Sequence, residues 1–126
     1  MTKIVRSVAE RVKKERQLDI PYEIGTMIEV PRATLISDQI ASLVDDDGKQ
    51  LCQFFSYGTN DLTQMTMGIS RDDSAGFIPT YMDKGIFEED PFKTIDEEGV
   101  GYLVRKSAAA GRMVKPDLSL SVCGEH

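Results

Sequence analysis

The chain has 126 residues, 40% of them hydrophobic, which suffices for one domain with a core of modest size. Its net charge of -6 argues against nucleic-acid and membrane-surface partners, because those surfaces attract a concentrated basic patch. No apolar run approaches the roughly 20 residues of a membrane-spanning helix, and the N-terminus is too charged for a signal peptide, so we expect a soluble intracellular protein.

The first 30 residues predict a helix followed by a strand. Residues 2–16 have the apolar spacing of an amphipathic helix that covers a core. Its apolar face consists of Val5, Val8, Ala9 and Val12. Pro21 closes this helix, and residues 24–30 form a short apolar segment in which Gly25 lets the backbone pass close to a neighbour. We interpret this segment as a buried strand.

A second helix and a second strand follow. Pro31 suits the first turn of a helix, where a missing N–H costs nothing. The expected buried stripe is Ile36, Ile40, Leu43 and Val44. Residues 45–49 look like the start of an EF-hand but lack its twelve-residue frame and closing glutamate, so we expect a solvated turn. Residues 51–57 then predict a strand, which completes the βαβ unit of a parallel sheet.

The segment after the second strand is less regular. We interpret Met65 and Met67 as residues that fill gaps in the core. Residues 70–92 are expected to be irregular, and a loop of this length usually serves as a lid or a partner surface.

A third helix and a third strand complete the chain. Thr94 and Glu97 have the spacing of a capping box that opens the helix, and Gly111 would end it. Its apolar face would be Val100, Leu103, Val104 and Ala108. Alternation over residues 118–123 predicts the last strand. The element order predicts an α/β fold with a parallel sheet, and a parallel strand without a covering helix after it suggests a domain that is cut.

Reactive side chains follow all three predicted strands. Glu29 and Asp61 stand at carboxyl ends of parallel strands, where α/β folds bind ligands, and two carboxylates suit Mg²⁺. Alternatively, Glu29 supports the next helix N-terminus and Asp61 caps a turn or helix. Asn60 could donate to an oxyanion, or it could be a structural turn residue.

The two cysteines have neither a CxxC spacing nor a histidine cluster, so we expect reduced thiols rather than a disulfide or a zinc site. Cys123 ends a predicted strand, with Glu125 and His126 close by in the sequence. An exposed thiol in that position could exchange protons with a carbon acid. The alternative is that Cys123 is a small buried hydrophobe.

Three motifs closely resemble the C-terminal PEP/pyruvate-binding barrel of the pyruvate, phosphate dikinase family. They are GTMIEVPR at residues 25–32, FFSYGTNDLTQMT at residues 54–66 and CGEH at residues 123–126. Enzyme I of the sugar phosphotransferase system and phosphoenolpyruvate synthase have segments similar to the first two. The intervening stretch, residues 70–101, is similar to the dikinase family's own loop and helix, whereas residues 45–50 look longer than usual there.

The resemblance implies a partial (β/α)8 TIM barrel in which residues 1–126 supply strands five to seven and are truncated at both ends. The other strands, with the substrate-binding arginines, would lie outside this chain, as would the phosphohistidine and ATP-grasp domains of the same parent chain. The parent would be a homodimer in the cytoplasm or in an organelle such as a chloroplast or glycosome. We expect the isolated fragment to be inactive and unstable.

The resemblance also implies a role for each motif residue. Glu29 and Asp61 match Mg²⁺ ligands, and Glu29, Thr59, Asn60 and Asp61 match substrate contacts. Cys123 matches the proton-transfer residue. The implied reaction interconverts ATP, phosphate and pyruvate with AMP, diphosphate and phosphoenolpyruvate through a phosphohistidine. The alternatives are a phosphoenolpyruvate synthase, an enzyme I-like protein, and a degenerate barrel fragment without catalysis.

Overall fold

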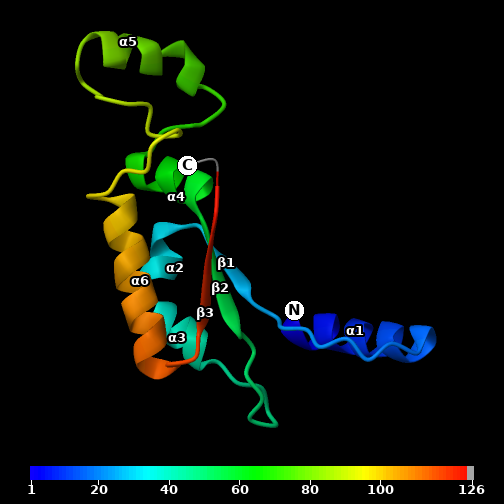
Figure 1. The fold of residues 1–126 in the computed structure, drawn as a ribbon. Helices are drawn as coiled ribbons and strands as arrows, with labels where there is room; N and C mark the ends of the chain where they lie inside the picture. The colour runs from blue at the N-terminus through cyan, green and yellow to red at the C-terminus, as the bar shows by residue number, and fades with distance from the viewer. Residues whose placement is uncertain (125–126) are drawn as a thin grey trace.

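A computed structural model describes residues 1–124 and contains a three-stranded parallel sheet in the order β1-β2-β3 (Figure 1). The strands are β1 (Thr26–Ile28), β2 (Phe54–Gly58) and β3 (Ser119–Cys123). Both neighbouring pairs are parallel. The predicted α/β fold with a parallel sheet is therefore confirmed.

Helices cover one face of this sheet (Figure 1). They are α2 (Pro31–Leu35), α3 (Ser37–Ser42) and α6 (Val100–Val114). Phe55 and Tyr57 of β2 point toward them and are almost completely buried, together with Ile28 of β1 and Leu118, which directly precedes β3. The Tyr57 hydroxyl donates a hydrogen bond of 3.0 Å to Ser107 Oγ on α6, which satisfies its polar end inside the core.

Within residues 1–124, no helix covers the opposite face of the sheet (Figure 1). Because strand side chains alternate, the residues between the core positions project there. The register aligns Met27 with Ser56 and Ser56 with Ser121 in one row across the three strands. Met27 is 41% exposed, and Ser121 is exposed as well. Rows of this kind are what the interior of a barrel presents.

Helix α1 (Thr2–Arg16) has the predicted bounds, but the prediction that it covers a core is wrong. None of its residues is buried, and Val5, Val8 and Val12 are each more than 40% exposed. The helix ends at Gln17, whose φ of 53° is left-handed, and the extended segment after it carries α1 away from the sheet (Figure 1). The sequence pattern shows that a helix has an apolar face, but it does not show what that face contacts.

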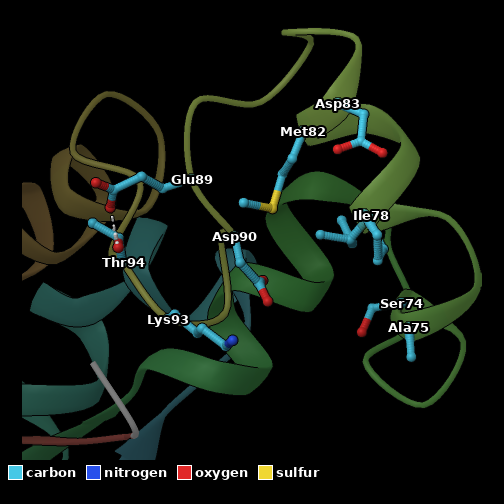
Figure 2. Close-up of a pocket in the computed structure, with 10 residues that line it drawn as sticks. Ser74, Ala75, Ile78, Met82, Asp83, Glu89, Asp90, Lys93 and Thr94 are labelled. Atoms are coloured by element: carbon cyan, nitrogen blue, oxygen red, sulfur yellow. Dashed lines mark hydrogen bonds between the residues drawn. The ribbon is translucent and has the colours of Figure 1, made fainter.

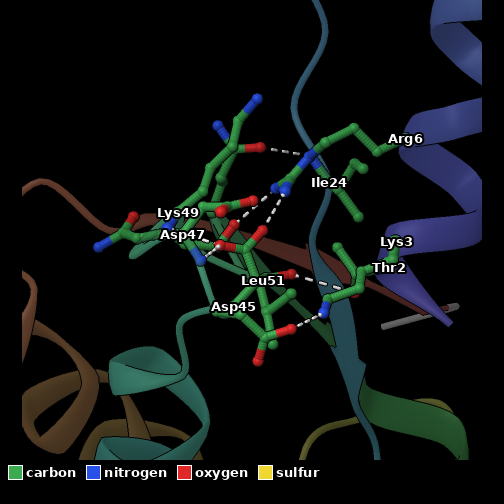
Figure 3. A network of polar contacts seen from close by, with 11 residues as sticks. Thr2, Lys3, Arg6, Ile24, Asp45, Asp47, Lys49 and Leu51 are labelled. Carbon is green, nitrogen blue, oxygen red and sulfur yellow. Dashed lines mark hydrogen bonds and ion pairs between the residues drawn. The ribbon is translucent and has the colours of Figure 1, made fainter.

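Polar contacts join α1 to the turn between α3 and β2 (Figure 3). Arg6 pairs with Asp45 at 2.9 Å and donates a hydrogen bond of 2.7 Å to the Gln50 carbonyl. The prediction that this turn is solvated is only partly correct. The Asp46 side chain is 89% exposed, whereas that of Asp45 is 7% exposed. Asp45 is therefore the anchor of this contact.

Acidification is expected to loosen α1. The Lys49 N–H, assisted by the Asp47 N–H and the Arg6 guanidinium, lowers the pKa of Asp45 below its usual value. A carboxylate with a lowered folded-state pKa contributes stability above its unfolded pKa, about 3.9, and this contribution is lost as the pH falls through the folded value. We expect α1 to stay attached at neutral pH and to be released in that acidic window.

Pepsin cleavage of residues 18–24, followed by mass spectrometry, measures this release. At about pH 4, just above the usual aspartate pKa, Asp45→Asn should be cleaved several times faster than the unsubstituted protein, and the ratio should approach one as the pH falls further. Asp46→Asn is the matched control, because its carboxylate is exposed. Equal cleavage of Asp45→Asn and the unsubstituted protein at the higher pH would contradict the anchoring role.

The helix predicted from Pro31 is two short helices with a break at Ile36. Of the expected stripe, Ile40 packs against the core, but Leu43 and Val44 are 52% and 51% exposed. The residues of these two helices that are buried instead are small: Thr34, Ser37 and Ala41. Small side chains let α3 approach α6, where the Ser37 and Ser107 hydroxyls share a hydrogen bond.

The region after β2 contains more helix than predicted. Helix α4 (Thr59–Met67) buries Leu62 and Thr63. Met65 is 55% exposed, so the prediction that Met65 fills a gap in the core is wrong. Residues 70–92 include a 3-10 turn, η1 (Ser74–Gly76), and α5 (Ile78–Asp83), so the prediction of an irregular segment is only partly correct.

Helix α6 also differs from its prediction at both ends. The Asp96 carboxylate accepts the N–H groups of Gly99 and Val100, at 3.1 and 3.2 Å, in place of the predicted capping box. The Thr94 hydroxyl donates to Glu89 instead. Gly111 lies inside the helix, where a Cβ would stand 2.6 Å from Leu118 Cδ2. A glycine that permits close packing thus resembles a helix stop in the sequence. Within residues 1–124, no helix has the length and apolar character needed to cross a membrane.

Candidate functional site

The carboxyl ends of the three strands place Glu29, Gly58 and Cys123 in one row. Gly58 pairs with Cys123, and Ile28 pairs with Tyr57, so Glu29 stands one residue beyond the last β1–β2 pair and level with Gly58. All three residues are in the alternating positions that project to the uncovered face. The structure therefore brings together the ends of strands that are far apart in the sequence.

The side chain of Glu29 lies across Gly58. A Cβ placed on Gly58 would be 2.7 Å from Glu29 Oε2 and 2.8 Å from Glu29 Cβ, so only glycine leaves room for the carboxylate. The N-cap of helix α2 is Val30, which makes no side-chain hydrogen bond, and the alternative that Glu29 supports this helix N-terminus through its charge stays a prediction. Gly58 is not among the site residues predicted from the sequence. A glycine at a strand end can nevertheless indicate that another group approaches the backbone closely.

Helix α4 begins immediately after Gly58 and carries the other predicted site residues in its first turn. Asp61 is exposed in this turn, so its carboxylate is accessible. Its position also agrees with the alternative that its negative charge stabilises the helix N-terminus. Asn60 Oδ1 is buried and has no hydrogen-bond partner among the described residues. Thr59 is 1% exposed, and its hydroxyl donates a hydrogen bond of 3.3 Å to the carbonyl oxygen of Cys123.

The two cysteines occupy opposite environments. Both are free thiols, as predicted, but Cys123 is exposed and Cys52 is buried. The alternative that Cys123 is a buried hydrophobe is therefore wrong, and that description fits Cys52, whose pKa is raised by burial. The predicted neighbours of Cys123, Glu125 and His126, lie outside the described residues.

Selective alkylation tests this difference. N-ethylmaleimide reacts with the accessible thiolate, so the folded protein is expected to be modified at Cys123 before Cys52. Peptide mapping by mass spectrometry at successive times gives both rates, and denaturation in urea should bring them close together. Equal rates in the folded protein would show that the end of β3 is covered.

The donor set of this edge suits a hard cation. Within residues 1–124, no cluster of three or more histidine, cysteine or acidic side chains is in place to hold a metal ion. Mg²⁺ keeps several waters, however, and usually takes only one or two protein carboxylates. Glu29 is held over Gly58, Asp61 follows three residues later, and the buried Asn60 Oδ1 lacks a partner. These oxygen donors fit Mg²⁺ better than a thiophilic metal.

A separate hollow of about 620 Å³ lies between α5 and residues 89–94 (Figure 2). Ile78 and Met82 supply its apolar side, and Asp83, Glu89 and Asp90 supply carboxylates. None of the predicted site residues lines this hollow. This hollow and the row at the strand ends are therefore different places on the molecule.

The whole chain, residues 1–126, matches the family model described as PEP-utilising enzyme, PEP-binding domain. It is 52% identical over 123 residues to pyruvate, phosphate dikinase 2 of Oryza sativa subsp. japonica, covering 98% of this chain and 13% of that protein. The pyruvate, phosphate dikinase of Clostridium symbiosum is 50% identical over 123 residues, with the same coverage. That of Giardia intestinalis is 49% identical over 126 residues, covering 100% of this chain and 13% of the relative. The chain thus spans 13% of the length of these three relatives.

Proposed function

Because the chain belongs to the PEP-utilising enzyme family and matches its PEP-binding domain, we propose that it is part of a pyruvate, phosphate dikinase. The relatives named as pyruvate, phosphate dikinases support this proposal, since they are about half identical to nearly all of the chain. The parent would interconvert ATP, phosphate and pyruvate with AMP, diphosphate and phosphoenolpyruvate. This segment would serve the half-reaction between pyruvate and phosphoenolpyruvate.

The observation that carries the proposal is the row at the strand ends. Glu29 and Cys123 flank Gly58 on the same face of the sheet, and the first turn of α4 follows directly. Converting pyruvate into its enolate requires a base near the methyl group and stabilisation of the developing charge on oxygen. The Cys123 thiol would supply the base, and the carboxylates of Glu29 and Asp61 would hold a cation that stabilises the charge on oxygen.

Glu29 and Asp61 would hold Mg²⁺. When bound, this ion supplies a Lewis acid and a template for enolate and phosphoryl oxygens. The two carboxylates come from different elements, and Gly58 keeps Glu29 close to the backbone that leads to Asp61. The protein's contribution is thus to fix two oxygen donors on the edge where the substrate would sit.

The N-terminus of α4 would bind the anionic parts of the substrate. Gly58 is its N-cap and provides no side-chain hydrogen bond, and the first N–H groups of a helix lack intrahelical acceptors. Such N–H groups favour carboxylate or phosphoryl oxygens. Thr59 and Asn60 would contribute main-chain N–H groups, and the Asn60 amide, whose oxygen has no partner among the described residues, would also be available.

Cys123 would transfer the proton. As a thiolate it would take one proton from the methyl group of pyruvate, leaving the enolate, whose oxygen would then accept the phosphoryl group of the phosphohistidine. In the reverse direction the thiol would return that proton to the methylene carbon of the enolate. The exposure of Cys123 at the end of β3 supports this role, since a carbon acid must reach the sulfur.

We further propose that the sheet is part of a (β/α)8 barrel, with this chain forming strands five to seven. The uncovered sheet face, the rows of side chains on it and the greater length of the relatives support this. The remaining strands and the phosphohistidine domain would come from the same parent chain, which the family resemblance implies is a dimer. The isolated 126-residue chain should then be inactive.

Isotope exchange in the intact parent protein tests the proposal. With Mg²⁺ present, the protein should exchange the methyl protons of pyruvate for deuterium in heavy water, measured by NMR. Release of diphosphate in the presence of ATP and phosphate would distinguish a dikinase from a phosphoenolpyruvate synthase or an enzyme I-like protein. A folded parent that catalyses no exchange would instead be a degenerate protein.

A further inference from the structure

We propose that the hydroxyl group of Thr59 is a positioning group that holds the end of β3 so that the Cys123 thiol faces the substrate. This inference rests on the proposed function for its catalytic meaning. In this proposal the Thr59 side chain does not contact the substrate. Only the main-chain N–H of Thr59 would make that contact.

The geometry of Thr59 excludes its side chain from the open edge. The residue is 1% exposed, and its hydroxyl proton is used in the hydrogen bond to the Cys123 carbonyl oxygen, at 3.3 Å. The two residues are 64 positions apart in the sequence. The bond therefore joins the first residue of α4 to the last residue of β3.

The Cys123 carbonyl lies at the point where the β2–β3 pairing stops, since Gly58 and Cys123 form its last pair. The hydrogen bond from the buried Thr59 hydroxyl therefore fixes the orientation of the Cys123 carbonyl.

The consequence for chemistry is geometric. Thr59 belongs to the same helical turn as Asn60 and Asp61, which would hold the substrate and its metal. One hydroxyl thus fixes the distance between the thiol and the groups that orient pyruvate. A displacement of about 1 Å between reacting groups can cost on the order of 100-fold in rate.

Two substitutions separate this role from a general effect on folding. Thr59→Val keeps the shape of the side chain and removes the donor, whereas Thr59→Ser keeps the donor and removes a methyl group. Thr63→Val is the matched control, because Thr63 is a 0% exposed threonine on the same helix whose hydroxyl has no partner among the described residues.

The test measures kcat and KM for pyruvate methyl-proton exchange in the intact parent protein, with melting temperature as a check on folding. Thr59→Val should lower kcat by about 10- to 100-fold, with little change in KM for pyruvate, because orientation rather than binding is lost. Thr59→Ser should restore most of kcat, and Thr63→Val should leave it unchanged. If Thr59→Val is insoluble, Thr59→Ala removes the same donor.

Other results would overturn the proposal. One is an unchanged kcat in Thr59→Val, and another is an equal loss in Thr59→Ser. Failure of the proposed function is a separate outcome, recognised because Cys123→Ala would then retain exchange. In that case the rate of Cys123 alkylation by N-ethylmaleimide still tests the positioning: it should differ from the unsubstituted protein in Thr59→Val and match it in Thr59→Ser.

Discussion

Replacing Cys123 with alanine is expected to slow pyruvate methyl-proton exchange by about 100- to 10,000-fold, the usual contribution of a positioned acid or base. The physical reason is that alanine leaves no group at the end of β3 that can accept the methyl proton. The ATP-dependent phosphorylation of the histidine should continue, since in the proposed parent it would take place on other domains. Proton NMR in heavy water measures the first reaction, and labelling with radioactive ATP measures the second.

Cys52→Ala provides the control, because Cys52 is the other free thiol of the described residues and is buried in the core. It should retain the exchange rate at temperatures well below its melting transition. Exchange that persists at the normal rate in Cys123→Ala would mean that another base takes the proton. The role proposed for Cys123 would then have to be withdrawn.

Replacing Gly58 with alanine is expected to raise the Mg²⁺ concentration needed for half-maximal exchange, and to lower the rate at saturating Mg²⁺ by on the order of 100-fold. The new Cβ would stand 2.7 Å from Glu29 Oε2 and 3.0 Å from the Met27 methyl group, so the carboxylate has to move. The alanine itself carries no charge and removes none. Any change in metal dependence therefore reports the displacement of Glu29.

Gly76→Ala is the matched control, because a Cβ there meets nothing within 4 Å. It should leave both the Mg²⁺ dependence and the rate unchanged. Titration of exchange activity with Mg²⁺ gives the comparison, and direct Mg²⁺ binding by calorimetry gives a second measurement that does not depend on turnover. An unaltered Mg²⁺ requirement in Gly58→Ala would argue against Glu29 as a ligand.

The three strands were accessible from the sequence because buried parallel strands are short apolar runs that end at polar residues. Residues 24–30, 51–57 and 118–123 each overlap one observed strand, and the polar residues at their ends indicate the candidate site edge. Glu29, Asp61 and Cys123 were found by this pattern and by family resemblance. Their roles as ligands and proton carrier stay predictions.

What the sequence could not provide are contacts between distant residues. The bond from Thr59 to the Cys123 carbonyl leaves no local pattern, since any threonine at a helix start looks the same. The position of α1 is another case, because its valine spacing predicts an apolar face that the described chain does not cover. At α6 the sequence pattern indicates a capping box of Thr94 and Glu97, whereas in the structure the neighbouring Asp96 accepts the N–H groups at the helix start.

Gly25, just before β1, and Gly58, at the end of β2, are constrained for different reasons, and this difference should be visible in evolution. A Cβ on Gly25 would meet the main-chain oxygen of Phe54, so no change of a neighbouring side chain could accommodate it. The three atoms nearest to a Cβ on Gly58 all belong to side chains, those of Glu29 and Met27. In lineages that abandon catalysis, Gly58 and Glu29 are free to drift together, whereas Gly25 persists for as long as the sheet does.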